Sequence, residues 1–315
     1  MTAAIPISVL SLNPAVDMTY EVAELKENQK SHASATRYDP GGNGVNVGRA
    51  LKTLGVNARH HYIIAGEIGR FLERMLEKQL DNIHYVYVDG ETRINVTLLE
   101  QSTTAQYEIS GVGPALNSEC LTDLLAEFIY SCDQGLGVLT GAVPPGVPKD
   151  IYGLLAARIH EQGGRAVVDT HGVLLQYALK SHPFLIKPNR HELETYCGKA
   201  LASLDEIVAE ARRIQRESAD YVCVSLGADG AILAGPDKVL HAVAPPVQVN
   251  CTVGAGDSMV AGMVAAFSRG ESAEDALKLG IACGCATARH PGTELFVRDE
   301  INPLIENIEV RYLDR

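Results

Sequence analysis

The stretch Thr252-Val-Gly-Ala-Gly-Asp-Ser258, which continues into the apolar segment 259–267, gives the strongest indication of the fold. It reads as a glycine turn that enters a helix. Gly254 and Gly256 allow a tight turn that points N–H groups at one spot, where the helix dipole also favours an anion. A turn of this kind can stabilise the charge of a phosphoryl group during transfer.

Asp257 follows the second glycine of this turn directly. Beside an anion site, a carboxylate is electrostatically unfavourable unless it has a task, such as accepting the proton of a substrate hydroxyl. The structural alternative is an N-cap at an ordinary helix start. The sequence favours the first interpretation, so we predict that Asp257 is a general base.

A second glycine-rich turn, Gly41-Gly-Asn-Gly44, also precedes a helical stretch. Its backbone can approach sugar hydroxyls closely, with Asn46 and Asp17 as orienting groups. A tight turn without a ligand fits the spacing equally well. The Walker pattern G-x-x-x-x-G-K-[ST] and the dinucleotide pattern G-x-G-x-x-G are both absent from the sequence.

Short apolar runs alternate with amphipathic stretches along most of the chain. The runs at 7–10, 165–168, 184–186 and 221–224 are typical of buried strands. Segment 151–162 has a helical apolar face, and Ser203-Leu-Asp-Glu206 is a capping-box signature that begins a helix. This order predicts an α/β fold with a doubly wound, mainly parallel sheet flanked by helices.

Two regions, 17–38 and 85–110, interrupt this order because their polar and apolar residues alternate without a helical period. They read as exposed strands, and the second contains a hairpin pattern around the polar turn 101–104. A small sheet over one end of the α/β body would act as a lid and offer a dimer contact. Since no linker separates two halves, we expect residues 1–315 to form one domain that includes this lid.

Polar residues also follow two of the buried strands. Asn189 and Glu192 come after 184–186, at the carboxyl edge of the sheet, where their oxygens suit Mg²⁺ bound through water. Segment 225–230 reads as the end of a strand followed by a turn, which would contact the phosphates of a nucleotide. Arg93 and Lys30 lie in the predicted lid, where surface charge is the simpler interpretation.

The composition narrows the class of protein. The chain has 315 residues, is 46% hydrophobic and carries a formal net charge of −12, which predicts a globular protein and argues against nucleic acid as a partner. We expect a cytoplasmic protein without a membrane segment, because neither a basic leader nor a long apolar run occurs. The seven scattered cysteines read as free thiols.

In their order along the chain, these motifs resemble the phosphofructokinase B branch of the ribokinase-like carbohydrate kinases, over nearly the whole length. The segments that carry the resemblance are Asn13-Pro-Ala-Val-Asp17, Gly41-Gly-Asn-Gly-Val-Asn46, Thr92-Arg-Ile-Asn95, Lys187-Pro-Asn189, Ser225-Leu-Gly227 and Thr252-Val-Gly-Ala-Gly-Asp-Ser258. The resemblance implies a ribokinase-like fold, ATP as co-substrate, dependence on Mg²⁺ and a homodimer formed through the lid strands.

The resemblance also implies a role for each matching residue. Asp257 would be the base, with Gly254, Ala255 and Gly256 as the anion hole. The phosphosugar would be held by Asp17, Lys30, Gly41, Gly42, Asn46, Arg93 and Asn95, with Arg93 at its phosphate. The nucleotide would contact Ser225, Gly227, Gly230, Thr252 and Gly284, while Asn189 and Glu192 would serve Mg²⁺ through water.

The implied reaction is transfer of the ATP γ-phosphoryl group to a ketohexose phosphate. Segments 113–117, 144–146, 169–172 and 291–293 look most like the minor bacterial 6-phosphofructokinases, which favours fructose 6-phosphate as substrate and fructose 1,6-bisphosphate as product. Segment 187–190 looks more like 1-phosphofructokinase, and tagatose-6-phosphate kinase also remains open.

Three residues depart from the pattern of this branch. Asn43 stands where the compared enzymes carry Gly or Lys, Ala142 where they usually carry Ser, and His32 where an Arg is found. The positions of Asn43 and Ala142 should line the sugar site. A missing hydroxyl at position 142 removes a hydrogen bond worth about 0.5–1.5 kcal/mol, enough to change substrate choice. A ribose or nucleoside kinase of the same fold therefore stays open, as does a non-catalytic sugar sensor, against which the intact Asp257 turn argues.

Overall fold

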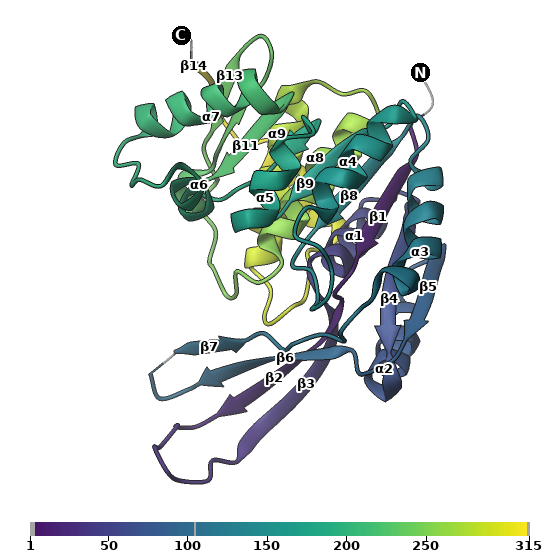
Figure 1. Cartoon of the computed structure of the whole chain (residues 1–315). Helices are drawn as coiled ribbons and strands as arrows, with labels where there is room; N and C mark the ends of the chain where they lie inside the picture. Colours follow the sequence, from purple (N-terminus) through teal and green to yellow (C-terminus); the bar gives the residue numbers. More distant parts are fainter. Residues whose placement is uncertain (1–3, 104, 314–315) are drawn as a thin grey trace.

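The computed structural model describes residues 4–103 and 105–313, which form a large sheet between helices and a smaller sheet beside it (Figure 1). In spatial order, the strands of the large sheet are β14 (Val310–Leu313), β13 (Val239–Ala242), β12 (Ala231–Ala234), β11 (Tyr221–Ser225), β10 (Leu185–Ile186), β9 (Arg165–Asp169), β8 (Leu136–Thr140), β1 (Ile7–Ser11), β4 (Arg59–Ala65) and β5 (Ile83–Val88). Neighbours from β5 to β11 are parallel, and those from β11 to β14 are antiparallel.

Helices cover both faces of this sheet, so its strands are buried on two sides. One face is covered by α1 (Asn43–Thr53), α8 (Ala255–Ser268), α9 (Ala273–Ala288) and α10 (Ile301–Ile305). The other is covered by α3 (Ser118–Ser131), α4 (Ile151–Glu161), α5 (Gly172–Leu179), α6 (Arg190–Cys197) and α7 (Leu204–Ser218). Successive residues such as Val9 and Leu10 enter opposite cores, which explains the continuous apolar runs. The predicted doubly wound α/β fold is confirmed.

The smaller sheet is called the lid below. It consists of β3 (Ala33–Gly41), β2 (Ala15–Val22), β6 (Arg93–Glu100) and β7 (Gln106–Ile109), in that spatial order. β2 is parallel to β6 and antiparallel to β3, and β6 and β7 form the predicted hairpin. Figure 1 shows these strands extending away from the α/β body.

The boundaries predicted for the lid need correction. Residues 85–88 belong to β5, which pairs in parallel with β4 at the edge of the large sheet. An edge strand is covered less completely, and its mixture of half-buried and exposed residues imitates that of a lid strand. β2 also begins at Ala15, and 23–32 is an irregular connection between β2 and β3.

The topology of the large sheet defines where a ligand is expected. From β1 the chain continues to β4 and β5 on one side, whereas β8, β9 and β10 lie on the other side of β1. In open α/β sheets, ligands bind at the carboxyl ends of the strands where the order reverses. That edge, between β1 and β8, is where the lid begins.

Helix α8 is held in place by unusually close contact with α9. A Cβ at Gly262 would lie 2.9 Å from the Cα of Gly280, and one at Gly284 would lie 3.1 Å from the carbonyl oxygen of Ala255. Residues 257–268 of α8 are all buried. The start of α8 is therefore fixed deep in the body, beside the carboxyl edge of the sheet.

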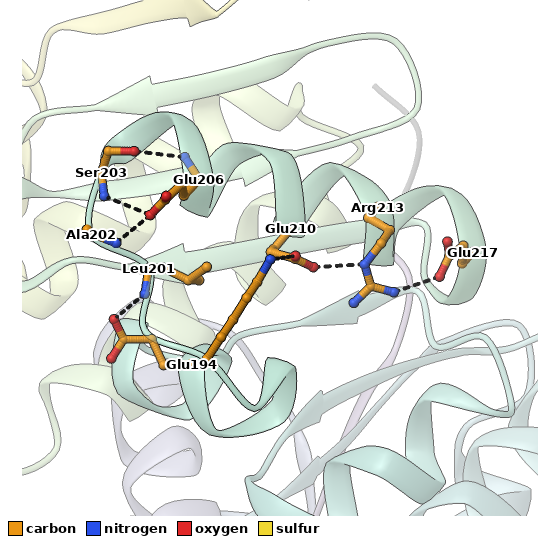
Figure 2. Close-up of polar contacts among 9 residues, drawn as sticks. Glu194, Leu201, Ala202, Ser203, Glu206, Glu210, Arg213 and Glu217 are labelled. Carbon is orange, nitrogen blue, oxygen red and sulfur yellow. Dashed lines mark hydrogen bonds and ion pairs between the residues drawn. The ribbon is translucent and has the colours of Figure 1, made fainter.

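Earlier in the chain, α7 begins with the capping box that the sequence predicted (Figure 2). The Ser203 hydroxyl accepts from the Glu206 N–H, and the Glu206 carboxylate accepts from the Ser203 N–H. Figure 2 also shows Arg213 between Glu210 and Glu217 on the same helix. None of the helices within 4–103 and 105–313 is long and apolar enough to cross a membrane.

Candidate active site

The glycine turn before α8 adopts the geometry expected from its sequence. Gly254 is the N-cap of α8 and has a left-handed backbone, with φ 78°, which glycine adopts without strain. Asp257 is the third residue of the helix. Its interpretation as an ordinary N-cap is therefore wrong, and its side chain points to another helix instead.

Two amides from the first turn of α1 hold the Asp257 carboxylate. Asn43 Nδ2 donates to Asp257 Oδ1 and Asn46 Nδ2 donates to Oδ2, each at 2.9 Å. The two asparagines are three residues apart on one helix, so their side chains lie on the same face. Gly42, the N-cap of α1 with φ 91°, allows the turn from β3 into this helix.

Burial makes Asp257 a stronger base than an exposed aspartate. Only 6% of the residue is exposed. Desolvation, supported by the nearby charge of Asp169, raises the pKa of Asp257 to about 7, against the lowering effect of Asn46, Asn43 and Lys187. A carboxylate with a pKa near neutrality suits general-base catalysis at physiological pH.

Lys187 and Asp169 add a buried ion pair beside this carboxylate. Lys187 Nζ lies 3.3 Å from Asp169 Oδ1, and a Cβ at Gly256 would lie 3.4 Å from the same nitrogen. Burial tends to lower the pKa of Lys187, but the charges of Asp169, Glu192 and Asp257 outweigh it and raise that pKa. The glycine thus leaves room for an ammonium group next to the turn.

The lid contributes a second group of polar side chains. Asp17 Oδ1 accepts from Asn95 Nδ2 at 2.7 Å, and Arg93 Nε donates to the carbonyl of Asn13 at 3.0 Å. Asp17 and Asn95 are paired residues of β2 and β6, so both side chains face the α/β body. A Cβ at Gly41 would lie 2.0 Å from Asp17 Oδ2, which explains the glycine there.

These groups line one cavity of about 390 Å³ at the carboxyl edge of the sheet. The predicted site residues among its walls are Asp17, Gly42, Asn46, Arg93, Asn95, Asn189, Glu192, Gly254, Gly256 and Asp257. A larger hollow of about 980 Å³ lies at the opposite edge, around Ile7 and Ser268, and contains none of the predicted residues.

Other predicted residues lie outside the walls of this cavity. They are Lys30, Gly41, Ser225, Gly227, Gly230, Thr252, Ala255 and Gly284. Lys30 is exposed on the connection between β2 and β3. Position 230 requires glycine for a structural reason, because a Cβ there would lie 1.9 Å from the carbonyl oxygen of Ala242. Ser225 forms a backbone bridge with Asn189 at the start of α6.

Asn189 and Glu192 have a structural role that the sequence analysis did not assign. Asn189 is the N-cap of α6, its Oδ1 accepts from the Glu192 N–H at 2.9 Å, and Glu192 Oε2 accepts from the Asn189 N–H at 2.8 Å. Each acceptor oxygen still has a further lone pair, and both residues line the cavity. No cluster of three or more metal-binding side chains occurs among the described residues.

Asp169 and Lys187 also line the cavity, and they were not predicted as site residues. Asp169 ends β9 and Lys187 follows β10. Polar residues after buried parallel strands meet at one edge of the sheet, and this rule could have identified both as site residues. Asn43 and Ala142, the two departures that were expected at the sugar site, lie in the wall of this cavity. The third, His32, is exposed on the β2–β3 connection.

Most of the chain matches a known protein family. Residues 10–299 match the family described as pfkB family carbohydrate kinase. The chain belongs to this family. A carbohydrate kinase transfers a phosphoryl group to a sugar. The cavity brings together the buried carboxylate of Asp257, the start of α8 and polar side chains of the lid.

Relatives in the pfkB family carry two kinds of name. The chain is 35% identical to the 1-phosphofructokinase of Bacillus subtilis, covering 93% of this chain and 96% of the relative. It is 31% identical to the ATP-dependent 6-phosphofructokinase isozyme 2 of Escherichia coli, with the same coverage. The crystal structure of phosphofructokinase-2 from E. coli in complex with substrates and products has a TM-score of 0.92, with 30% identity over 96% of this chain and 99% of that chain.

The raised pKa of Asp257 predicts a pH-dependent stability. The unfolded carboxyl loses its proton near the ordinary value of 3.8 and the folded one near 7, so between these values the folded state binds more protons. This group therefore lowers the free energy of unfolding as pH rises, and its effect is complete above pH 7. Asp257→Asn removes this titrating carboxyl. In urea denaturation, the free energy of unfolding of the variant minus that of the wild type should therefore be more positive at pH 8 than at pH 5.

The control is Asp133→Asn, at an exposed carboxylate outside the cavity. Its stability difference from the wild type should be similar at both pH values. An Asp257→Asn difference that is equal at pH 5 and pH 8 would contradict the assignment of a raised pKa.

Proposed function

We propose that this protein is an ATP-dependent kinase that phosphorylates the C1 hydroxyl of fructose 6-phosphate and yields fructose 1,6-bisphosphate and ADP. The observation that carries the proposal is the buried carboxylate of Asp257, which shares one cavity with the start of α8 and with Arg93 of the lid. The 6-phosphofructokinase isozyme 2 relatives support this substrate. The B. subtilis relative supports a second candidate, fructose 1-phosphate.

Asp257 would act as the base. The acceptor hydroxyl donates its hydrogen bond to the carboxylate and transfers its proton there as the oxygen attacks the γ-phosphorus atom of ATP. Asn43 and Asn46 fix both carboxylate oxygens, so the Asp257 side chain is already in one rotamer when the hydroxyl binds to it. The bond to the bridging oxygen of ADP breaks as the new P–O bond forms.

The start of α8 and Lys187 would stabilise the transferred group. The first N–H groups of a helix have no partner inside the helix, and the dipole there favours negative charge. Lys187 adds a formal positive charge beside Gly256. This arrangement binds the charge that spreads over the phosphoryl oxygens in the transition state.

The residues present also fit Mg²⁺. Asp169, Glu192 and Asp257 line the same cavity with Lys187, and the charges of these acids raise the pKa of Asp169 and of Asp257 in addition to burial. The cavity therefore favours added positive charge. Asn189 and Glu192 would hold the ion through water, and the ion would supply charge neutralisation on the nucleotide phosphates. Ser225, Gly227, Gly230, Thr252 and Gly284 remain proposed nucleotide contacts.

Asp257→Asn tests the proposed base. We expect turnover to fall by roughly 10²–10⁴-fold, because the amide accepts no proton. The affinity for ATP, measured by calorimetry, should change little because Asp257 faces the acceptor. Asp133→Asn is the matched control and should keep full turnover. Loss of less than tenfold in the Asp257 variant would remove Asp257 as the base.

The substrate is tested by ADP release with Mg-ATP, comparing kcat/KM for fructose 6-phosphate, fructose 1-phosphate, tagatose 6-phosphate, ribose and adenosine. We expect the highest value for fructose 6-phosphate. Arg93→Ala should raise the KM for the phosphosugar by about tenfold or more, since a charge-assisted contact to phosphate is lost, while exposed Arg158→Ala should not. Preference for ribose or adenosine would overturn the phosphosugar assignment, and no sugar-dependent turnover would favour a sensor.

We also propose a homodimer formed through the outer face of the lid. Opposite to the face of Asp17, residues paired across the four strands form an apolar row: Tyr38, Met18, Val96 and Ile109. Ile109 is 59% exposed and the adjacent Tyr107 is 46% exposed. An open sheet with an exposed apolar face is a typical association surface. Lys30, exposed on the connection between β2 and β3, remains a proposed phosphosugar contact.

The dimer proposal is tested by sedimentation velocity of Tyr107→Glu/Ile109→Glu. Two carboxylates on the outer face of the lid should convert the dimer to a monomer, because burial of unpaired charge opposes association. Tyr130→Glu, at an exposed tyrosine of α3 outside the lid, is the control and should stay dimeric. A monomeric wild-type protein, or a double variant that remains a dimer, would contradict the proposal.

A further inference from the structure

We propose that Asn43 is a positioning residue: it fixes the carboxylate of Asp257 so that one oxygen faces the acceptor hydroxyl in a constant direction. The inference rests on the proposed function, because it takes Asp257 as the base. Asn43 is the first residue of α1, and its amide donates to Asp257 Oδ1 from a helix other than the one that carries the aspartate.

Two hydrogen bonds hold both oxygens of the Asp257 carboxylate. A carboxylate that is bonded at one oxygen can still rotate about its Cβ–Cγ bond, because terminal torsions of Asp are broad. Asn46 holds Oδ2, and Asn43 holds Oδ1, both at 2.9 Å. The second bond removes the remaining rotation. Asn46 is 3% exposed, whereas Asn43 is exposed at the cavity. Of the two donors, Asn43 is therefore the one on the substrate side.

Asn43 is itself supported by a rigid turn. A Cβ at Gly141 would lie 3.0 Å from Asn43 Oδ1, so the carboxamide packs directly against this glycine. Gly141 is fixed by its N–H, which donates to the carbonyl of Asp169 at 3.0 Å, and by its carbonyl, which accepts from the hydroxyls of Tyr152 and Thr170. The Asn43 side chain therefore lies between a fixed backbone and the base.

The hydrogen bond from Asn43 favours the ionised form of Asp257 and lowers its pKa. Other ionisable groups line the same cavity and are unchanged when only residue 43 is altered: Asp17, Arg93, Glu108, Asp169, His171, Lys187 and Glu192. A shift in titration between the wild type and an Asn43 variant therefore reports on this one contact. A residue that only supports the fold would not produce such a shift.

The experiment uses Asn43→Ala and Asn43→Leu in the full-length protein. The first removes the carboxamide, and the second keeps its branched shape but has neither a donor nor a charge. We expect the acidic limb of kcat/KM for the preferred sugar phosphate to move upward by roughly one pH unit in both variants. The KM for ATP should stay within about twofold. Asn57→Ala removes an exposed amide outside this cavity and should leave the limb unchanged.

A second readout does not depend on turnover. ¹³C NMR of labelled aspartate carboxyls follows the titration of Asp257 directly, and its signal is assigned by its loss in Asp257→Asn. An upward shift in both Asn43 variants supports the proposal even if no sugar is phosphorylated, in which case only the proposed function fails. If Asn43→Ala does not fold, the shape-conserving Asn43→Leu alone decides. A carboxyl titration that coincides with the wild type in the folded variants would overturn the role of Asn43.

Discussion

The carboxylate of Asp257 is buried, and the rest of the site is arranged around that constraint. A buried charge is costly unless polar groups surround it. Two amides from α1 supply these groups on one side, and Lys187 supplies positive charge nearby. The close packing of α8 on α9 through Gly262 and Gly280 keeps the carboxylate at this depth. The cost that remains appears as a raised pKa, which is the property that a base at neutral pH requires.

The order of the strands decides which groups can meet Asp257. Asp169 and Lys187 are 18 positions apart in the sequence, yet they end neighbouring strands and form a buried ion pair at 3.3 Å. On the other side of the cavity, the pleat of β2 and β6 directs Asp17 and Asn95 inward and Met18 and Val96 outward. One small sheet therefore presents a polar face to the cavity and an apolar face to the outside.

The sequence predicted the elements with a strong local signal and missed what depends on pairing in space. The apolar runs and the capping box of α7 were placed correctly, because they express burial and hydrogen bonding within a few residues. Strand β5 was assigned to the lid, because edge strands of both sheets show the same alternation. Asn43 was expected at the sugar site, but its contact with Asp257 was missed because the two residues are 214 positions apart. Asn189 and Glu192 were read as ligands, although their spacing also matches the capping box that they form.

The lid and the first turn of α1 are continuous in the chain. Strand β3 ends at Gly41, and α1 begins at Asn43, so a single residue, Gly42, separates a lid strand from an amide that holds Asp257. The same strand is tied to the loop after α9 by the ion pair between Arg37 and Glu294. A displacement of β3 therefore also moves Asn43, and through it the carboxylate of Asp257. In the proposed reaction, movement of the lid over a sugar and alignment of the base would be one motion.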